Sequence, residues 1–549
     1  MRVRGRHLGS ARGLAAPHLP RKGGPPLPAR AATRAGARGG ACAQMALATG
    51  AERERCAAQA WRRAPPPRAA DVRPSQPLPA PMRPAAAALA LAALLAATAS
   101  PARSLTTADG KIVGAVGAER RLGACTARRR ADAATAAPPT PLAPPPPPPQ
   151  PFLKGVCWFG FNNEYKMLSD LYTGTDSQTR DFRTVVWRMK ALGFNAIRVA
   201  FNFDTLDKPT GDKPYRMACR DAGAGALFGS VTPPGGAGPT GGGPPPSIPN
   251  GVCNDGIPDD SVYRRFLWAC DYIASQDMYV LVDWHNSGKA DKVGDAGFVS
   301  PDDFINRWAR LVADLQAMPH TPGKLMIDIM NEPDAYDLKW EPSAGRPGMS
   351  DLYLRMMDRV APTCPDCLFF VEGTGQSNAR ANWGDGFITD EEIIRENGRV
   401  SSAKPFFEVV VTKPYIAQVV LAPHIYCPSS SKAADGYAGG DLYGRLDDSF
   451  GGKVSGKGYC NRDGVCHKFA VVLGETSNNF YSGGPAEKQC WDSISTYVNR
   501  GPNNGTGVFS GWFYWGWNSN SADTGGLVSS TNPRDIDWSK VDSLRKIGL

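Results

Sequence analysis

The feature that most constrains the fold is a series of eight short apolar runs that alternate with amphipathic helical stretches after residue 152. Helical patterns lie at residues 179–192, 261–276, 301–318, 351–361 and 485–499. Alternating strand and helix segments predict a parallel sheet, and eight such units over about 400 residues favour a closed (β/α)8 TIM barrel of the α/β class. No G-x-G-x-x-G motif follows the first run, which disfavours a dinucleotide-binding fold. The runs lie at residues 153–160, 196–201, 279–284, 325–330, 367–372, 419–424, 469–474 and 511–517.

The N-terminal region differs in composition from the rest of the chain. Residues 1–99 contain 16 Lys and Arg but only three acidic residues, so they carry the whole basic excess behind the formal net charge of +10. The remaining residues carry a net charge of −3 and offer no basic footprint for nucleic acid. Because the region is rich in Ala, Arg, Pro and Gly without hydrophobic periodicity, we expect residues 1–81 to be a disordered or untranslated leader.

A secretion signal follows this leader. Met82-Arg83 precedes the apolar run at 85–97, and Ala97-Thr98-Ala99 forms an A-x-A cleavage site. The run is too short to span a bilayer. We therefore predict a signal peptide over residues 82–103, a start codon at Met82 and a secreted product without a membrane segment. The alternative is a plastid transit peptide, since an Arg-rich, acid-poor leader is also typical of that signal.

Residues 104–151 combine a predicted strand with a Pro-rich insertion. SLTTADGKIV at 104–113 reads as the first strand of a hairpin at the floor of the barrel, with the run from Phe152 as its partner. The basic, Ala-rich stretch between them ends in six prolines and Gln150, which suits either a retained intron read in frame or a polyproline linker. Both interpretations predict disorder, as does the Gly/Pro-rich stretch 222–250, which we expect to be a surface loop.

Polar and aromatic residues stand at the C-terminal ends of the predicted strands, where TIM barrels carry their chemistry. Charged groups at the ends of several apolar strands are costly unless they react or form pairs. These positions hold Arg198 on the second strand, Asp283 and His285 on the third, Asn331 and Glu332 on the fourth, Glu372 on the fifth, His424 and Tyr426 on the sixth, Glu475 on the seventh, and Trp512, Trp515 and Trp517 on the eighth.

Several motifs give the chain a family resemblance. KGVCWFGF at 154–161, IDIMNEP at 327–333, HIY at 424–426, LGE at 473–475 and YWGWNSNSADTGG at 514–526 resemble glycoside hydrolase family 5, the cellulase family. N-E-P after the fourth strand combined with G-E after the seventh is far more specific than N-E-P alone. The resemblance covers residues 152–540 and the strand at 104–113. It implies one catalytic domain over residues 152–549 that hydrolyses β-1,4-linked polysaccharide with retention of anomeric configuration.

Two glutamates are the expected catalytic pair. A retaining glycosidase needs two carboxyl groups about 5–5.5 Å apart, one protonated and one ionised. The fourth and seventh strands lie on opposite walls of an eight-stranded barrel, so Glu332 and Glu475 are expected to face each other across its mouth. The resemblance implies that Glu332 is the acid/base and Glu475 the nucleophile.

The resemblance also implies roles for substrate-binding residues. Asn331 would hydrogen-bond the sugar 2-hydroxyl, and Arg198 and Tyr426 would hold Glu475 ionised. His285 and His424 would bind sugar hydroxyls or tune the acid. Trp515 would stack on the sugar in the −1 subsite, with Trp158 or Phe159 lining the adjacent subsite.

Three further carboxyl groups on the predicted strands have no role that the resemblance implies. We expect Asp283 and Asp328 to support the barrel. For Glu372, packing or a surface position is expected rather than a place in the cleft.

Cysteine usage agrees with export. Ten of the 13 cysteines lie from Cys157 onward, and no zinc-binding spacing occurs, so disulfides are expected. Cys460 with Cys466 and Cys364 with Cys367 are the predicted local pairs; C-x-x-C also suits a redox motif, although no thioredoxin-like context surrounds it. Asn504-Gly-Thr is a glycosylation sequon if the chain is secreted. No H-E-x-x-H or Cys/His cluster predicts a metal, and no cofactor is expected.

The sequence therefore predicts a secreted, monomeric endo-β-1,4-glucanase acting on cellulose or a related β-glucan. The alternatives are a β-mannanase, another β-glycanase or a transglycosylase on the same scaffold, since subsite residues decide this choice and the fold does not. An inactive carbohydrate-binding barrel is a further alternative, which the presence of both glutamates disfavours. No separate carbohydrate-binding module is visible in the sequence.

Overall fold

The computed structural model divides the chain into Met1–Ala88 and Leu89–Leu549. The residues that it describes all belong to the second unit. The predicted leader, the signal peptide, the Pro-rich segment and Asn504 lie outside them. The described residues are 105–108, 110–114, 152–171, 178–211, 215–239, 241–248, 250–285, 300–336, 338–343, 345–374, 384–396, 400–431, 436–500, 509–521, 524–529 and 535–549.

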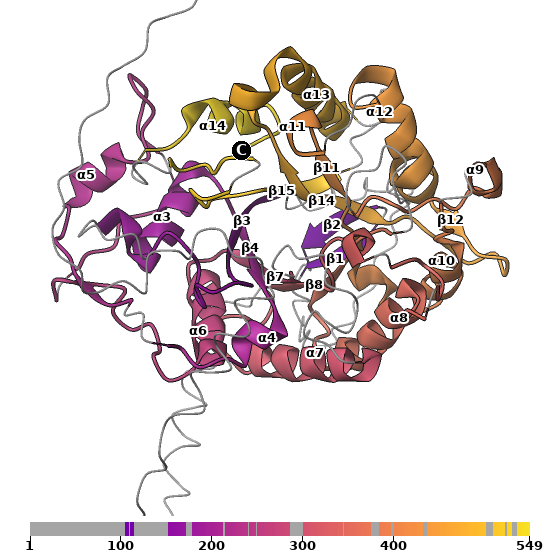
Figure 1. Ribbon diagram of the computed structural model, residues 1–549, viewed down its shortest axis with the longest axis horizontal. Helices are drawn as coiled ribbons and strands as arrows, with labels where there is room; N and C mark the ends of the chain where they lie inside the picture. The colour runs from indigo at the N-terminus through magenta and orange to yellow at the C-terminus, as the bar shows by residue number, and fades with distance from the viewer. Residues whose placement is uncertain are drawn as a thin grey trace, which may run out of the picture. The chain divides into compact units, whose positions relative to one another are not determined.

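Parallel strands form a closed barrel, as the alternating pattern predicts (Figure 1). Each strand pairs in parallel with the next, and β15 pairs with β3 to close the ring. The sixth position is shared by β10 and β11, because Pro423 between them has no N–H for a continuous ladder. The barrel strands are β3 (Leu153–Phe161), β4 (Ala196–Phe201), β7 (Tyr279–Trp284), β8 (Leu325–Asp328), β9 (Leu368–Val371), β10 (Val419–Leu421), β11 (His424–Tyr426), β14 (Ala470–Ser477) and β15 (Phe509–Tyr514).

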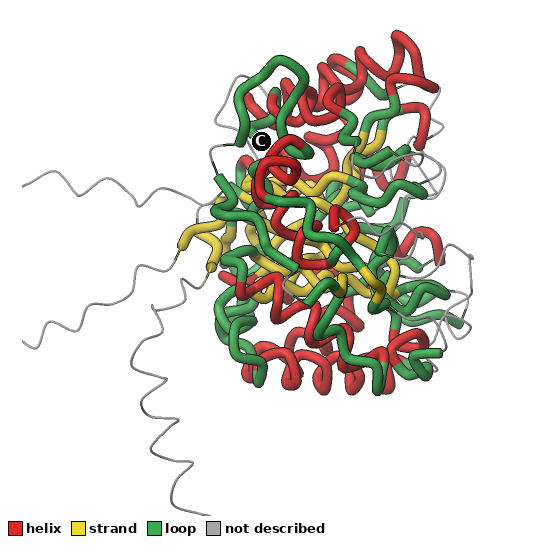
Figure 2. The backbone as a smooth tube through the Cα atoms, turned by 90° about the vertical axis from the view of Figure 1, so that its left-hand side faces the viewer, coloured by secondary structure: helices red, strands yellow, loops and turns green. Residues whose placement is uncertain are grey.

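Helices surround the strands, which occupy the middle of the unit in Figure 2. Ser261 and Ser300 accept a hydrogen bond from the backbone N–H of the third residue of the helices that follow them, which satisfies donors that the helix itself leaves open. The helices are α3 (Phe182–Leu192), α4 (Phe203–Leu206), α5 (Ala224–Gly229), α6 (Val262–Ser275), α7 (Pro301–Gln316), α8 (Met349–Val360), α9 (Glu391–Glu396), α10 (Lys404–Val410), α11 (Pro428–Ser431), α12 (Gly439–Leu446), α13 (Phe480–Arg500) and α14 (Trp538–Arg545), with short 3-10 turns η1 (Gln178–Arg180), η2 (Pro333–Tyr336), η3 (Ala361–Thr363) and η4 (Ile416–Gln418) and the π-helix η5 (Asp447–Gly456).

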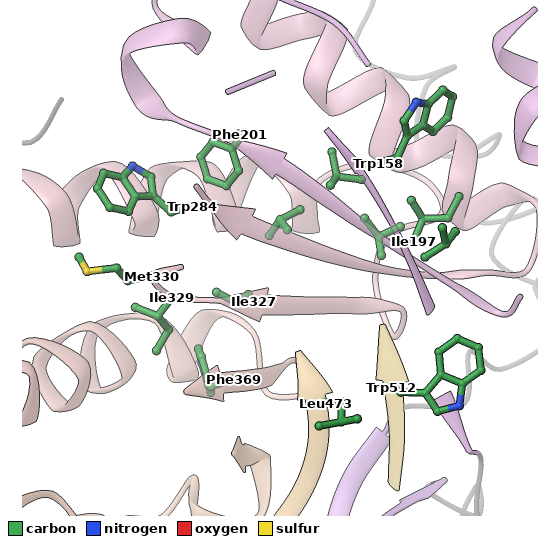
Figure 3. Close-up of a cluster of buried hydrophobic side chains, with 14 of the residues drawn as sticks. Trp158, Ile197, Phe201, Trp284, Ile327, Ile329, Met330, Phe369, Leu473 and Trp512 are labelled. Carbon is green, nitrogen blue, oxygen red and sulfur yellow. The ribbon is translucent and has the colours of Figure 1, made fainter. Parts of the chain in front are cut away.

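The two-residue period of the strands separates two hydrophobic cores. Alternate residues of each strand point outward and pack against the helices, and the large side chains Trp158, Trp284 and Trp512 belong to this outer core (Figure 3). The other residues point inward, where Leu281, Met326 and their neighbours fill the barrel. Polar side chains that share the inward direction are therefore stacked above this apolar floor.

A hairpin closes the floor of the barrel, but its strands differ from the expectation. β1 (Leu105–Ala108) pairs in antiparallel fashion with β2 (Lys111–Gly114), so the segment expected to be one strand is a complete hairpin. The run from Phe152 is instead the first barrel strand. Gly110 at the turn adopts φ +73°, which glycine tolerates without steric cost. Ile112 is fully buried with the inner core, and its N–H donates to Ser510 at the start of β15 (3.1 Å).

The expectation of disorder for residues 222–250 is wrong for most of that stretch. The Cys219–Cys253 disulfide closes it, β5 (Met217–Ala218) pairs with β6 (Val252–Cys253), and α5 lies between them. Scattered apolar residues such as Leu227 and Val231 are buried against the barrel. A prediction from composition alone misses these buried apolar residues, because the stretch is rich in Gly and Pro.

Four disulfides join cysteines of the described region. Both predicted local pairs, Cys364–Cys367 and Cys460–Cys466, are confirmed. The others are Cys219–Cys253 and Cys427–Cys490, and Cys157 and Cys270 are buried free thiols. In the described part of the chain, no helix is both long and apolar enough to cross a bilayer.

Candidate active site

The register of neighbouring strands brings charged side chains to one level of the barrel interior. Asp283 is the register partner of both Ala200 on β4 and Asp328 on β8. Arg198, two residues before Ala200, shares their inward direction, and all three charged side chains are fully buried. Burial of so many charges is tolerable only if they neutralise one another.

Arg198 is the centre of this charge cluster. Its Nη2 lies 2.9 Å from Asp328 Oδ2, 3.2 Å from Asp283 Oδ1 and 3.3 Å from Glu372 Oε1, and its Nη1 donates to Glu475 Oε1. Burial opposes the charge of the guanidinium, but the surrounding carboxylates raise the pKa of Arg198 well above its usual value. Arginine is therefore a permanent cation here, and it ties the predicted nucleophile to the walls of the barrel.

Glu475 on β14 is almost fully buried and accepts hydrogen bonds at both carboxylate oxygens. Arg198 donates to Oε1, and the Tyr426 hydroxyl donates to Oε2. Burial alone would raise the pKa of Glu475, but His424, Arg198 and His285 together with the Tyr426 hydrogen bond hold it below its usual value. The carboxylate is therefore kept ionised, as a nucleophile requires.

Glu332 follows β8 and has a different environment. Its side chain is 20% exposed, and Oε1 lies 3.0 Å from Nδ1 of His424. Its backbone has φ +42°, a left-handed conformation that costs a non-glycine residue about 1–3 kcal/mol and is typical of functional sites. The backbone N–H donates to Glu372 Oε2 (2.7 Å).

The two glutamates meet across the barrel. One carboxylate oxygen of Glu332, one of Glu475 and a ring nitrogen of His424 all lie within 4.8 Å of one another. His424 itself is fully buried, with Nδ1 3.6 Å from Glu475 Oε2. The structure therefore brings together the buried, paired carboxylate of Glu475 and the partly exposed carboxyl of Glu332.

Three rings line the site next to Glu475. The His285 ring is nearly parallel to the Trp515 ring, with centroids 5.0 Å apart, and Phe159 stacks on Trp515 at 5.4 Å. His285 Nδ1 lies 2.9 Å from Asp283 Oδ2 and 4.0 Å from Glu475 Oε1. Burial opposes protonation of the imidazole, but the Asp283 carboxylate raises the pKa of His285 above its usual value. Phe159 and Trp515 are both only partly buried.

Trp158 does not belong to the site, which corrects one expectation. Its side chain is fully buried, stacks on Phe182 of α3, and donates from Nε1 to the Ser169 carbonyl (3.1 Å). The physical reason is the strand period: Cys157 and Phe159 point inward, so Trp158 must point to the helices. Phe159, the other residue considered for this subsite, has the required direction.

Glu372 is the residue whose position the sequence analysis missed. It lies neither on the surface nor in ordinary packing: its fully buried carboxyl contacts Arg198, His424 and the Glu332 backbone. Asp283 and Asp328 are likewise members of the Arg198 cluster; burial, countered in part by Arg198, raises the pKa of Asp328 to about 6. The available signal was the position of Glu372 at the end of an apolar strand, the same signal that marked Glu332 and Glu475.

Asn331 completes the set of expected residues. Its side-chain Oδ1 accepts a hydrogen bond from Arg198 Nη2 (3.0 Å), so its amide nitrogen is the end of the side chain available to a ligand. Tyr426 and His424 lie on β11 beside Glu475, with which His424 is in register.

Among the described residues, three groups of acidic and histidine side chains are close enough to hold a metal ion. They are Asp283 with His285 and Glu475, Asp328 with Glu372 and His424, and Glu332 with His424 and Glu475. In each group, a carboxylate already pairs with the guanidinium of Arg198 or the imidazole of His424. These side chains supply the positive charge that a metal would bring, so the donor sets fit proton chemistry better than metal binding.

Comparisons with known proteins show the family and the fold of the chain. The family model described as cellulase (glycosyl hydrolase family 5) matches residues 245–521. The major extracellular endoglucanase of Xanthomonas campestris is 25% identical over 401 residues, which cover 71% of this chain and 65% of that protein. The chain thus spans slightly less than two thirds of the length of that relative.

Solved structures share the fold. The catalytic domain of the Xanthomonas campestris major endoglucanase has a TM-score of 0.50 and 20% identity, covering 72% of this chain and 95% of that one. An endocellulase from Pyrococcus horikoshii has a TM-score of 0.52 and 19% identity, covering 81% and 98%. The fold and the family model define a glycoside hydrolase of the cellulase type. The chain belongs to glycosyl hydrolase family 5.

Proposed function

We propose that the protein is a retaining endo-β-1,4-glucanase in which Glu475 is the nucleophile and Glu332 the acid/base. The observation that supports this most strongly is the approach of the two carboxyl groups, whose nearest oxygens lie within 4.8 Å. Retaining glycosidases have carboxyl groups about 5–5.5 Å apart, whereas inverting enzymes need about 6.5–9.5 Å to admit a water molecule.

In the first step, the ionised Glu475 attacks the anomeric carbon. The bond from that carbon to the glycosidic oxygen breaks, and Glu332 transfers its proton to the departing oxygen. Arg198 and Tyr426 keep Glu475 ionised through their hydrogen bonds. Glu332 is partly exposed and contacts His424 instead of Arg198, so we assign it the transfer of the proton.

In the second step, Glu332, now a carboxylate, removes a proton from water. The hydroxide oxygen bonds to the anomeric carbon while the ester bond to Glu475 breaks, which restores both glutamates. The Asn331 amide donates to the sugar 2-hydroxyl, an interaction that strengthens in the oxocarbenium-like transition state. Trp515 and Phe159 provide the aromatic surface for sugar rings.

The choice of β-1,4-glucan over mannan or another β-glycan is supported by the relatives, which are described as an endoglucanase and an endocellulase. We also propose that the protein is secreted as a monomer. Four disulfides suit an oxidising compartment, and the Xanthomonas relative is described as extracellular.

The test is reducing-sugar release from carboxymethyl-cellulose and from mannan, together with viscosity of the cellulose derivative. The proposal expects cleavage of the cellulose derivative, with viscosity falling before much sugar is released, and loss of both effects in Glu475→Ala. Cleavage of mannan alone would keep the mechanism and overturn the substrate. No cleavage of either polymer by folded protein would contradict the enzyme and favour a carbohydrate-binding barrel.

A further inference from the structure

Glu372 occupies a distinctive position behind the site, where it contacts Glu332 by two separate routes. Through Oε2 it accepts the backbone N–H of Glu332 (2.7 Å). Its Oε1 lies 3.0 Å from Nε2 of His424, whose opposite nitrogen, Nδ1, lies 3.0 Å from the Glu332 carboxyl. One buried carboxyl therefore contacts both the backbone of Glu332 and the partner of its side chain.

The backbone route matters because Glu332 adopts a left-handed conformation, with φ +42°. A non-glycine residue holds such a conformation only where its surroundings enforce it. The Glu332 N–H donates a hydrogen bond to Glu372, and this contact helps to hold the left-handed backbone conformation.

The imidazole route matters because a histidine ring is oriented by the group that binds its second nitrogen. Glu372 and Glu332 lie at ion-pair distance from opposite nitrogens of His424, so the Glu372 carboxyl attracts the ring from the side away from Glu332. Gly384 packs against the Glu372 carboxyl so closely that an added Cβ would lie 2.4 Å from Oε2. The carboxyl is thus fixed in place by its own surroundings.

We propose that Glu372 is a positioning residue that holds Glu332 in its proton-donating geometry, through the Glu332 backbone amide and through His424. This role rests on the proposed function of Glu332 as acid/base. Glu372 itself is too deeply buried to touch substrate. Its loss should therefore impair proton donation to the leaving group more than nucleophilic attack by Glu475, which Glu372 reaches only through Arg198 and His424.

The test compares two substrates that differ only in their need for a proton. Phenyl β-cellobioside has a poor leaving group that requires the acid, and dinitrophenyl β-cellobioside has a leaving group that departs without it. The parameter is kcat/KM, which reports the first step alone. Because general acid catalysis contributes about 10²–10⁴-fold, we expect Glu372→Gln in the full chain to lose about 10-fold or more on the phenyl substrate and only a few-fold on the dinitrophenyl substrate.

Glu487→Gln is the matched control. Glu487 is equally buried and accepts hydrogen bonds from the Ser429 and Asn479 backbone amides, but it has no described contact with Glu332 or His424. A purely structural glutamate should lower kcat/KM for both substrates in the same proportion. Glu372→Ala, which removes both routes, should widen the difference between the substrates.

Equal losses on both substrates in the Glu372 variants would overturn the proposal, because they would make Glu372 an ordinary structural group. Failure of both Glu372 variants to fold, measured by thermal unfolding, would do the same. Wild-type protein that cleaves neither substrate nor the polysaccharides would instead contradict the proposed function itself, and this role with it.

Discussion

His424 and Glu475 are direct register partners on the adjacent parallel strands β11 and β14, and His424 Nδ1 lies 3.6 Å from Glu475 Oε2. The same nitrogen lies 3.0 Å from Glu332 Oε1, so one imidazole sits between the two glutamates. Its charge state and position therefore bear on both carboxyls. The parallel pairing of β11 with β14 places His424 beside Glu475.

Tyr426→Phe tests how Glu475 is kept ionised. The change removes the hydroxyl that donates to Glu475 and so raises the pKa of that carboxyl. A hydrogen bond to a charged group contributes about 1.5–3 kcal/mol, so its loss should raise the pKa by a readily measurable amount. Because Glu475 acts in its ionised form, activity is lost as pH falls through its pKa, and the acidic limb of kcat/KM against pH should move upward.

Tyr514→Phe is the control for that profile. Tyr514 is also buried, but its hydroxyl faces the Asn478 carbonyl instead of Glu475. Its removal should leave the acidic limb in place. An unchanged limb in Tyr426→Phe, or an equal shift in both variants, would show that the Tyr426 hydrogen bond does not set the ionisation of Glu475.

Glu332→Ala should separate the two steps of the reaction. With dinitrophenyl β-cellobioside the first step needs no acid, so the glycosyl-enzyme forms and then waits for a base that is absent. Azide, an anion that attacks without giving up a proton, should restore turnover and yield the β-glycosyl azide. The fall in kcat without azide should be about 10²–10⁴-fold. The absence of rescue in folded protein, or formation of the α-azide, would reject Glu332 as acid/base.

Neighbouring aromatic residues on β3 should behave in opposite ways. Trp158→Ala removes a fully buried ring from the outer core and should lower the free energy of unfolding by about 3–5 kcal/mol. Phe159→Ala removes a partly exposed ring beside Trp515 and should raise KM with a smaller loss of stability. Thermal unfolding and steady-state kinetics of both variants check this, and the reverse pattern would mean that the two side chains have been assigned to the wrong faces.

The disulfides should contribute unequally to stability. Cys427 and Cys490 are 63 residues apart, whereas Cys460 and Cys466 are six apart. By the loop-entropy relation, replacing both cysteines of a pair by alanine should cost about 4 kcal/mol for the long loop and about 2 kcal/mol for the short one. Thermal midpoints of the two double variants give the order, and a larger loss from the Cys460–Cys466 pair would contradict it.

Much of the barrel could be predicted because its signals are local. All eight predicted strands overlap observed ones, since each apolar run is bounded by turn residues or by a helix pattern. Arg198 and Glu475, which the structure brings together, were also visible, because each is a charged residue towards the C-terminal end of an apolar run. The helix at 485–499 was found for a similar reason: α13 departs from helical geometry at Gly484, just before Pro485.

What could not be predicted depends on contacts distant in sequence. The direction of Trp158 follows from which residues of β3 face the barrel axis, and two large aromatic neighbours give no local signal for it. The importance of Glu372 arises from partners on β4, β11 and the loop after β8. The order in residues 222–250 depends on a disulfide whose pairing the sequence leaves open.

The most direct test of the double-displacement assignment is covalent trapping with a dinitrophenyl 2-deoxy-2-fluoro-β-cellobioside. The fluorine slows both steps, and the good leaving group allows the first to proceed, so the glycosyl-enzyme accumulates. Mass spectrometry of the intact protein and of its peptides should find one fluorocellobiosyl group, bound to Glu475. An adduct on another residue such as Glu332, or no adduct on protein that turns over the unfluorinated substrate, would contradict the account.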